Sequence, residues 1–198
     1  MENNFRDVKV LMFKEDTSVY PKYNLPDGFS LSTYKDGFEK YWAEIHVKLD
    51  QFKSYEDAVK CFEDTFFDGS DNIYKKCLFI LNSDGIPVAT ASLWDGNHFG
   101  KTLQRIHWVA VSPDYQGYGL AKTLVSKVLD LYNELGFDGF IYLTSQVSSY
   151  KALNIYSKFG FIPYLGEKPE NWVDCDFKKD TEYAWKAVEK LCCKKFLI

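Results

Sequence analysis

One stretch of the chain restricts its fold more than any other. Residues 103–111 (LQRIHWVAV) form an apolar run typical of a buried strand, and from 119 to 135 the apolar residues recur at the spacing of an amphipathic helix. Gly117 and Gly119 lie between the two patterns. A strand that enters a helix through glycines directs backbone N–H groups and the positive end of the helix at one point, and such a point binds phosphate without a basic side chain. Taken alone, the same glycines also fit an ordinary strand-to-helix turn.

Similar patterns divide the rest of the chain into strands and helices. Apolar runs and alternation predict strands at 7–13, 29–34, 77–82, 87–94, 139–144 and 161–164. Helical spacing predicts helices at 38–49, 54–67 and 180–191, and a short one between Ser149 and Gly160. The Asp84-Gly85 turn favours an antiparallel hairpin, whereas the strand–helix–strand order after residue 103 favours a parallel unit. Together they predict an α/β fold with a mixed sheet.

The composition fits one globular domain. The chain has 198 residues, of which 46% are apolar and 26% are charged, and this length buries enough surface for one core. We expect a single domain over residues 1–198, with an N-terminal extension (1–28), a core (29–164) and a C-terminal extension that contains a helix (165–198). Aromatic residues make up 18% of the chain, which fits either a core packed with rings or a ring-lined pocket.

Charge and residue type exclude several classes of protein. The net charge is -4 and the chain holds two arginines, Arg6 and Arg105, so it lacks the basic stripe of a nucleic-acid-binding protein. We expect no membrane span and no signal peptide, because no run of 18 apolar residues and no apolar leader occurs. Five cysteines without CxxC spacing and three scattered histidines predict free thiols in the cytoplasm and no metal site.

Three phosphate-binding motifs can be compared with the glycine turn. The dinucleotide fingerprint fails because Lys122 stands where its last Gly or Ala is needed, and the P-loop fails because its required glycines would fall at Gln116 and Ala121. The third motif, Q/R-x-x-G-x-G/A, matches Gln116, Gly119 and Ala121. It is a signature of the GNAT superfamily of acyl-CoA-dependent N-acyltransferases, which the chain resembles.

A second motif strengthens the resemblance. Ala152, Tyr156, Gly160 and Phe161 match A-x-x-x-Y-x-x-x-G-F, which the same superfamily carries later in its sequence. The resemblance covers roughly residues 29–164. It implies a mixed, mostly antiparallel central sheet that is flanked by helices and splayed between its fourth and fifth strands, with acyl-CoA in the wedge.

The resemblance also implies where acetyl-CoA binds. The end of strand 103–111 would pair with the pantetheine arm, and the backbone of the glycine turn would hold the pyrophosphate. In chain order these residues are Val109, Ala110, Val111, Gln116, Gly117, Tyr118, Gly119, Leu120, Ala121 and Lys122. Many members carry an Asn that contacts CoA at the position of Ser149; a serine hydroxyl could hydrogen-bond there or cap the helix.

Tyr156 is the strongest catalytic candidate. In the superfamily this tyrosine lies near the CoA sulfur and protonates the departing thiolate, and a phenol with a pKa near 10 keeps its proton at neutral pH. A core tyrosine is the other interpretation. For the base that takes a proton from the amine, the resemblance favours His107, with Glu44, Glu63 and His46 as alternatives.

The predicted function is transfer of an acetyl group from acetyl-CoA to a primary amine of a small molecule or peptide, by direct attack on the thioester. Trp42, Glu44 and Arg105 are expected to bind the acceptor, and no metal is expected to take part. A CoA-binding module without transferase activity and a protein-lysine acetyltransferase are the alternatives. We expect a monomer or a homodimer.

Overall fold

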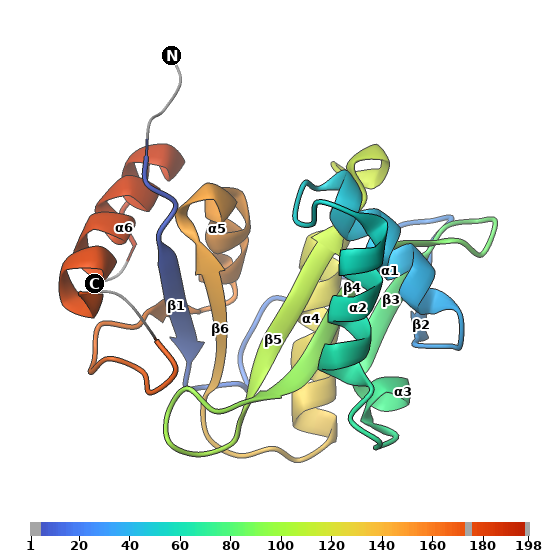
Figure 1. Cartoon of the computed structure of the whole chain (residues 1–198), viewed down its shortest axis with the longest axis horizontal. Coiled ribbons are helices and arrows are strands. Elements are labelled where there is room, and N and C mark those ends of the chain that lie inside the picture. The colour runs from blue at the N-terminus through green and yellow to red at the C-terminus, as the bar shows by residue number, and fades with distance from the viewer. Residues whose placement is uncertain (1–4, 173–175, 197–198) are drawn as a thin grey trace. The chain divides into compact units, whose positions relative to one another are not determined.

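A computed structural model of the chain describes residues 5–172 and 176–196 (Figure 1). The chain divides into two compact units. Unit 1 comprises Met1–Pro21, Asp95–Arg105 and Gly136–Ile198, and unit 2 comprises Lys22–Trp94 and Ile106–Leu135. In the described ranges, no helix has both the length and the apolar character needed to cross a membrane.

Unit 2 contains the first strands of the predicted core. The strand order is β2 (Ser30–Thr33), β3 (Cys77–Leu81), β4 (Pro87–Gly96) and β5 (Leu103–Val111), although the last residues of β4 and the first residues of β5 belong to unit 1. The helices of unit 2 are α1 (Phe38–Lys48), α2 (Tyr55–Phe66), α3 (Asn72–Lys76) and α4 (Leu120–Glu134). The sequence did not predict α3, because five residues are too few to show a helical period.

The core of unit 2 is built largely of rings. The buried rings that pack together are Tyr34, Trp42, Phe62, Phe66, Phe79 and Trp94. Ring centroids lie 4.8 Å apart for Phe62 and Phe66, 4.8 Å for Phe66 and Trp94, and 5.3 Å for Trp42 and Phe62. These distances are those of favourable aromatic pairs. In this unit the aromatic excess therefore belongs to the core.

Unit 1 is built around a strand from the N-terminus. Its strand order is β5, β6 (Ile141–Gln146), β1 (Lys9–Lys14) and β7 (Ile162–Pro163), and its helices are α5 (Tyr150–Lys158) and α6 (Phe177–Cys192). β1 pairs antiparallel with β6 from Lys9 opposite Gln146 to Lys14 opposite Ile141, and β7 pairs with its other edge. β1 is thus an inner strand of this sheet.

The predicted fold class is confirmed. β2, β3 and β4 pair antiparallel, as do β1, β6 and β7, whereas β5 and β6 are parallel, with Arg105 opposite Tyr142. The strands and the longer helices lie close to their predicted ranges, and α6 begins at Phe177, three residues earlier than expected. The short strand expected at 7–13 exists, but nothing in the sequence predicted its place inside a sheet.

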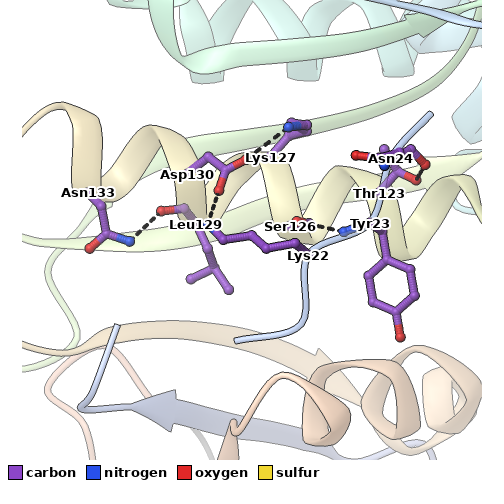
Figure 2. A network of polar contacts seen from close by, with 9 residues as sticks. All are labelled: Lys22, Tyr23, Asn24, Thr123, Ser126, Lys127, Leu129, Asp130 and Asn133. Carbon is purple, nitrogen blue, oxygen red and sulfur yellow. Dashed lines mark hydrogen bonds and ion pairs between the residues drawn. The ribbon is translucent and has the colours of Figure 1, made fainter. Parts of the chain in front are cut away.

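The segment that follows β1 packs along α4 (Figure 2). Figure 2 shows residues 22–24 in an extended stretch beside the helix. The contacts are a hydrogen bond of 3.2 Å from Thr123 Oγ1 to the Asn24 carbonyl, one of 3.3 Å from the Tyr23 N–H to Ser126 Oγ, and an ion pair between Lys22 and Asp130. Residues outside the predicted core thus hold α4 in unit 2.

The inner position of β1 can be tested by measuring stability. Met12 is fully buried, and Val10 and Leu11 are buried beside it. We expect Met12→Ala to lower the free energy of unfolding by about 2–5 kcal/mol, because it leaves a cavity in a packed strand. Denaturant unfolding measures this, with Val19→Ala as the control, since Val19 is 71% exposed. Equal unfolding free energies for the two variants would contradict the inner position of β1.

Candidate functional site

The glycine turn joins the end of β5 to α4 within unit 2. A 3-10 turn, Pro113–Tyr115, follows the strand, and Gly119 precedes the first residue of the helix. Gly117 and Gly119 have φ of 91° and 83°, in the left-handed region that glycine adopts without steric cost. A Cβ placed on either glycine would meet no atom within 4 Å. Open space therefore borders the turn, and only backbone lines it at these two positions.

Five consecutive backbone donors face no partner at this turn. In residues 5–172 and 176–196, the N–H groups of residues 117–121 make no hydrogen bond, and the first that does is Lys122, which donates to the Gly119 carbonyl at 2.9 Å. The first N–H groups of any helix lack an intrahelical acceptor, and they carry the positive end of the helix dipole. The turn thus offers a row of donors to an anion.

Side chains from elsewhere in unit 2 hold the turn. Gln116 Nε2 donates to the Val111 carbonyl at 3.4 Å, so the first motif residue ties the turn to the end of β5. The Phe29 ring lies 6.2 Å from that of Tyr115 and 5.6 Å from that of Tyr118. These contacts support the turn from the end of β5 and from Phe29.

Two supports of the turn escaped sequence reasoning. Phe29 contacts the rings described above, and the Lys122 ammonium lies 5.6 Å from the centre of the Tyr23 ring. Both aromatic residues are far from the turn in sequence, and neither belongs to a motif. No local pattern could have indicated them.

β5 is interrupted by a residue in the left-handed region, Trp108, whose φ is 49°. The rings of His107 and Trp108 lie 5.3 Å apart, whereas successive side chains of a regular strand point to opposite faces. The indole packs on Trp42 and His46, with ring centroids 5.1 Å away in each case. The regular alternation of side chains along β5 therefore breaks at His107 and Trp108. This packing offsets the cost of the unusual backbone.

The acceptor and base candidates of unit 2 differ in burial. Trp42 is buried in the ring-packed core, and Glu44 is exposed on α1. His107 is half-buried, its ring lies 6.4 Å from that of Phe66, and its carbonyl accepts the Ser92 hydroxyl at 2.9 Å. The structure thus brings His107 to the edge of the ring-packed core that contains Trp42, and it leaves Glu44 in solvent.

His46 is completely buried. Its Nδ1 contacts Gln51 Oε1, and its ring lies 3.9 Å from that of Trp42. Burial lowers the pKa of His46 to about 4, because an apolar setting disfavours the charged imidazolium. At neutral pH the ring is uncharged and enclosed, so its position suits packing better than proton transfer.

Tyr156 lies in unit 1, on α5. Its side chain is nearly buried and its ring is 6.1 Å from that of Phe161. Across the part of the chain that the structure describes, the Tyr156 hydroxyl has no hydrogen-bond partner. Burial raises the pKa of Tyr156. The phenol therefore keeps its proton at neutral pH, and no acceptor in the described chain competes for that proton.

The two remaining candidates also lie in unit 1. Ser149 precedes α5, but its side chain makes no capping hydrogen bond. Its neighbour Ser148 is held instead, since the Ser148 N–H and hydroxyl donate to the two Asp7 carboxylate oxygens at 2.8 and 2.9 Å. Arg105 is half-buried opposite Tyr142, and burial lowers its pKa.

Comparison with known proteins decides the family. The acetyltransferase (GNAT) family matches residues 36–161. The chain belongs to this family. The match contains the glycine turn and the second motif, and it leaves β1 and α6 outside. The predicted family is thereby confirmed, and the individual site residues stay predictions.

One relative and two solved structures illustrate the similarity. The L-amino acid N-acyltransferase MnaT of Escherichia coli (strain K12) is 26% identical over 106 residues, which cover 50% of this chain and 61% of that protein. A GCN5-related N-acetyltransferase from Sphaerobacter thermophilus shares the fold with a TM-score of 0.58 and 20% identity, over 81% of this chain and 50% of its own. The glucosamine-6-phosphate N-acetyltransferase of Arabidopsis thaliana shares the fold with a TM-score of 0.51 and 20% identity, over 74% of this chain and 99% of its own. The chain thus spans less than two thirds of the length of the first two proteins.

The burial of His46 predicts a pH-dependent stability. Its folded pKa lies below the ordinary value of 6.5, so the unfolded chain binds more protons between these values. The contribution of neutral His46 to the unfolding free energy is fully present above about pH 6.5 and is lost as the pH falls towards about 4. The unfolding free energy of the unchanged chain should fall between about pH 7.5 and pH 5.5, and we expect this fall to be about 1 kcal/mol smaller in His46→Leu.

Denaturant unfolding at the two pH values measures this difference. Phe52→Leu is the matched control, because Phe52 packs against the same rings and does not titrate. It should lower the stability equally at both pH values. If His46→Leu and the unchanged chain lost the same free energy on acidification, the buried neutral His46 would be refuted.

Proposed function

We propose that this GNAT family member transfers an acetyl group from acetyl-CoA to a primary amine of a small molecule. The observation that carries the proposal is the row of N–H groups of residues 117–121 at the start of α4, which have no partner in the described chain. A pyrophosphate presents several oxygens and two negative charges, which such a row and the helix dipole stabilise together. The open space beside Gly117 and Gly119 leaves room for it.

Unit 2 would hold acetyl-CoA mostly through its backbone. Residues 116–122 bind the pyrophosphate, and the backbone of Val109, Ala110 and Val111 pairs with the pantetheine arm. Lys122 adds a positive charge next to the turn. Acetyl-CoA supplies the acetyl group as a thioester. Because the backbone would be the main binding group, the pyrophosphate could bind although the chain has only two arginines.

Tyr156 is the proposed proton donor. When a neutral amine attacks the thioester carbonyl, a C–N bond forms, the C–S bond breaks and the sulfur needs a proton. Tyr156 has one to give, because burial raises its pKa and no group in the described chain accepts its hydrogen. Such a side chain supports a transferase over a module that only binds CoA.

The relatives support a small acceptor. The relative at 26% identity is named for acylation of L-amino acids, and this name favours a small amine over a protein substrate. A panel of amino acids, amino sugars and polyamines therefore tests the acceptor class. Release of the CoA thiol measures turnover with each amine.

A pair of glycine variants tests the backbone site. Gly119→Ala and Gly85→Ala each place a side chain at a positive φ, 83° and 77°, with no atom within 4 Å of the new Cβ. The strain should lower stability by about 1–2 kcal/mol in both. Only Gly119→Ala alters the anion site, so we expect it alone to weaken CoA binding, by about tenfold or more.

Calorimetric titration with CoA measures both affinities, and denaturant unfolding checks that the two variants are equally strained. Equal CoA affinity for the unchanged chain and Gly119→Ala would argue against the turn as the pyrophosphate site. A matching loss in Gly85→Ala would show that general strain is the cause.

Tyr156→Phe separates catalysis from binding. We expect kcat to fall by about a hundredfold while the Kd for CoA changes little, because the phenol is needed only when the thiolate leaves. Tyr132→Phe is the control, since Tyr132 is a buried tyrosine near the far end of α4. An unchanged kcat in Tyr156→Phe, or equal losses of kcat and CoA affinity, would remove the proton-donor role.

A further inference from the structure

A polar cavity of about 340 Å³ lies within unit 1. It is bordered by the start of β1, the end of β6, the loop before β5 and the segment around α6; the lining side chains that matter here are Asp7, Lys9, His98, Thr144, Trp172 and Asp180. Small-molecule sites combine an apolar wall with a few polar groups. This cavity offers the indole of Trp172 as the wall and charged and hydroxyl groups around it.

The sheet register explains why these groups meet. Leu11 lies opposite Thr144, and Lys9 lies opposite Gln146, so these side chains share one face of the β1–β6 pair. Tyr142, two residues before Thr144, shares that face and packs with Leu11 and Trp172. The cavity therefore lies beside a packed cluster and against the antiparallel β1–β6 ladder.

His98 is fixed at the edge of this cavity. Its Nδ1 and the Tyr142 hydroxyl share a hydrogen bond of 2.8 Å, and its ring lies 6.1 Å from that of Trp172. Its carbonyl accepts the Glu170 N–H at 3.2 Å. The other ring nitrogen, Nε2, has no hydrogen-bond partner in the described ranges. One nitrogen thus orients the ring, and the second is available to a bound molecule.

Gly96 allows the Tyr142 hydroxyl to reach this position. A Cβ on Gly96 would lie 1.8 Å from that hydroxyl oxygen and 3.0 Å from Arg105 Cδ. The end of β4 therefore needs glycine where the Tyr142 and Arg105 side chains approach its backbone. His98, Tyr142 and Arg105 form one polar group, contributed by the loop, β6 and β5.

We propose that this cavity binds the acceptor amine and that His98, rather than His107, is the base of the reaction. This inference rests on the proposed acetyl transfer. In the tautomer that this step needs, His98 Nδ1–H donates to the Tyr142 oxygen and Nε2 carries no hydrogen. The amine nitrogen attacks the thioester carbonyl and gives one proton to His98 Nε2, while the C–S bond breaks and the sulfur takes the Tyr156 proton. The imidazolium then returns a proton to the tyrosine oxygen through solvent. Acetylated amine and CoA thiol are the net products.

The charges around His98 suit this role. Burial lowers its pKa, and the cations of Arg105 and Lys9 lower it further, so the imidazole is neutral at physiological pH and can accept a proton. The carboxylates of Asp7 and Asp180 line the same cavity. They favour an acceptor that arrives as a cation and loses one proton to solvent before its neutral nitrogen attacks, and the Asp180 carboxylate is also paired with Arg6 at 3.1 Å.

Three variants test the proposal through the pH profile of kcat/KM, with an amine that the panel shows to be a substrate. We expect His98→Ala to lower kcat/KM by about a hundredfold or more, to lose the acidic limb of the profile and to regain turnover with added imidazole. Arg105→Gln removes a cation next to His98, so the limb should move to higher pH. Lys101→Ala, on an exposed residue of the same loop, should keep the original profile.

Other results would overturn the proposal. An intact limb in His98→Ala, its loss in His107→Ala instead, or a loss of turnover that imidazole does not rescue would each exclude His98 as the base. CoA titration of His98→Ala should give the Kd of the unchanged chain, which shows that the variant is folded. If the unchanged chain acetylates no amine, the proposed function fails together with this inference; if it acetylates one and His98→Ala does so equally well, only this inference fails.

Discussion

The antiparallel ladder between β1 and β6 is the interaction on which unit 1 depends. β6 is paired along its whole length with residues that begin at Lys9, before the region that matches the family. Removing β1 would expose the edge of β6 and uncover the side chains that pack on Val10, Leu11 and Met12. The ladder also sets the register that brings Tyr142 and Thr144 to the cavity where His98 lies. The N-terminal segment is therefore part of the candidate site's framework, and it continues past β1 to support α4 within unit 2.

The anion site of unit 2 follows from a different constraint. A helix cannot satisfy its own first N–H groups, and the chain leaves those of residues 117–121 unpaired beside open space. The glycines make this geometry cheap, and Gln116 and Phe29 keep it in place. A binding site of this kind uses few charged side chains, so two arginines and a net charge of -4 are compatible with the proposed pyrophosphate site. Specificity for the acceptor must then come from side chains, as in the proposed acceptor cavity.

The sequence predicted the elements well where the pattern was local. The apolar run of β5, the period of α4 and the motif residues Gln116 and Tyr156 were readable because each depends on near neighbours. Apart from α3, which is too short to show a helical period, the failures involve contacts between distant residues. The left-handed Trp108 arises from indole packing on α1, so no alternation within β5 could reveal it. The inner place of β1 depends on pairing with a strand more than a hundred residues away. His98 lies in a loop without a motif, and it becomes a candidate only through its contact with Tyr142.

The central claim is that the backbone at the start of α4 binds the pyrophosphate of CoA. The most direct measurement is a calorimetric comparison of CoA with pantetheine, which has the same thiol arm but no pyrophosphate or nucleotide. The account predicts that CoA binds at least a hundredfold more tightly, about 3 kcal/mol, and that added inorganic pyrophosphate competes with CoA. Equal affinity for the two compounds, with no competition by pyrophosphate, would contradict it.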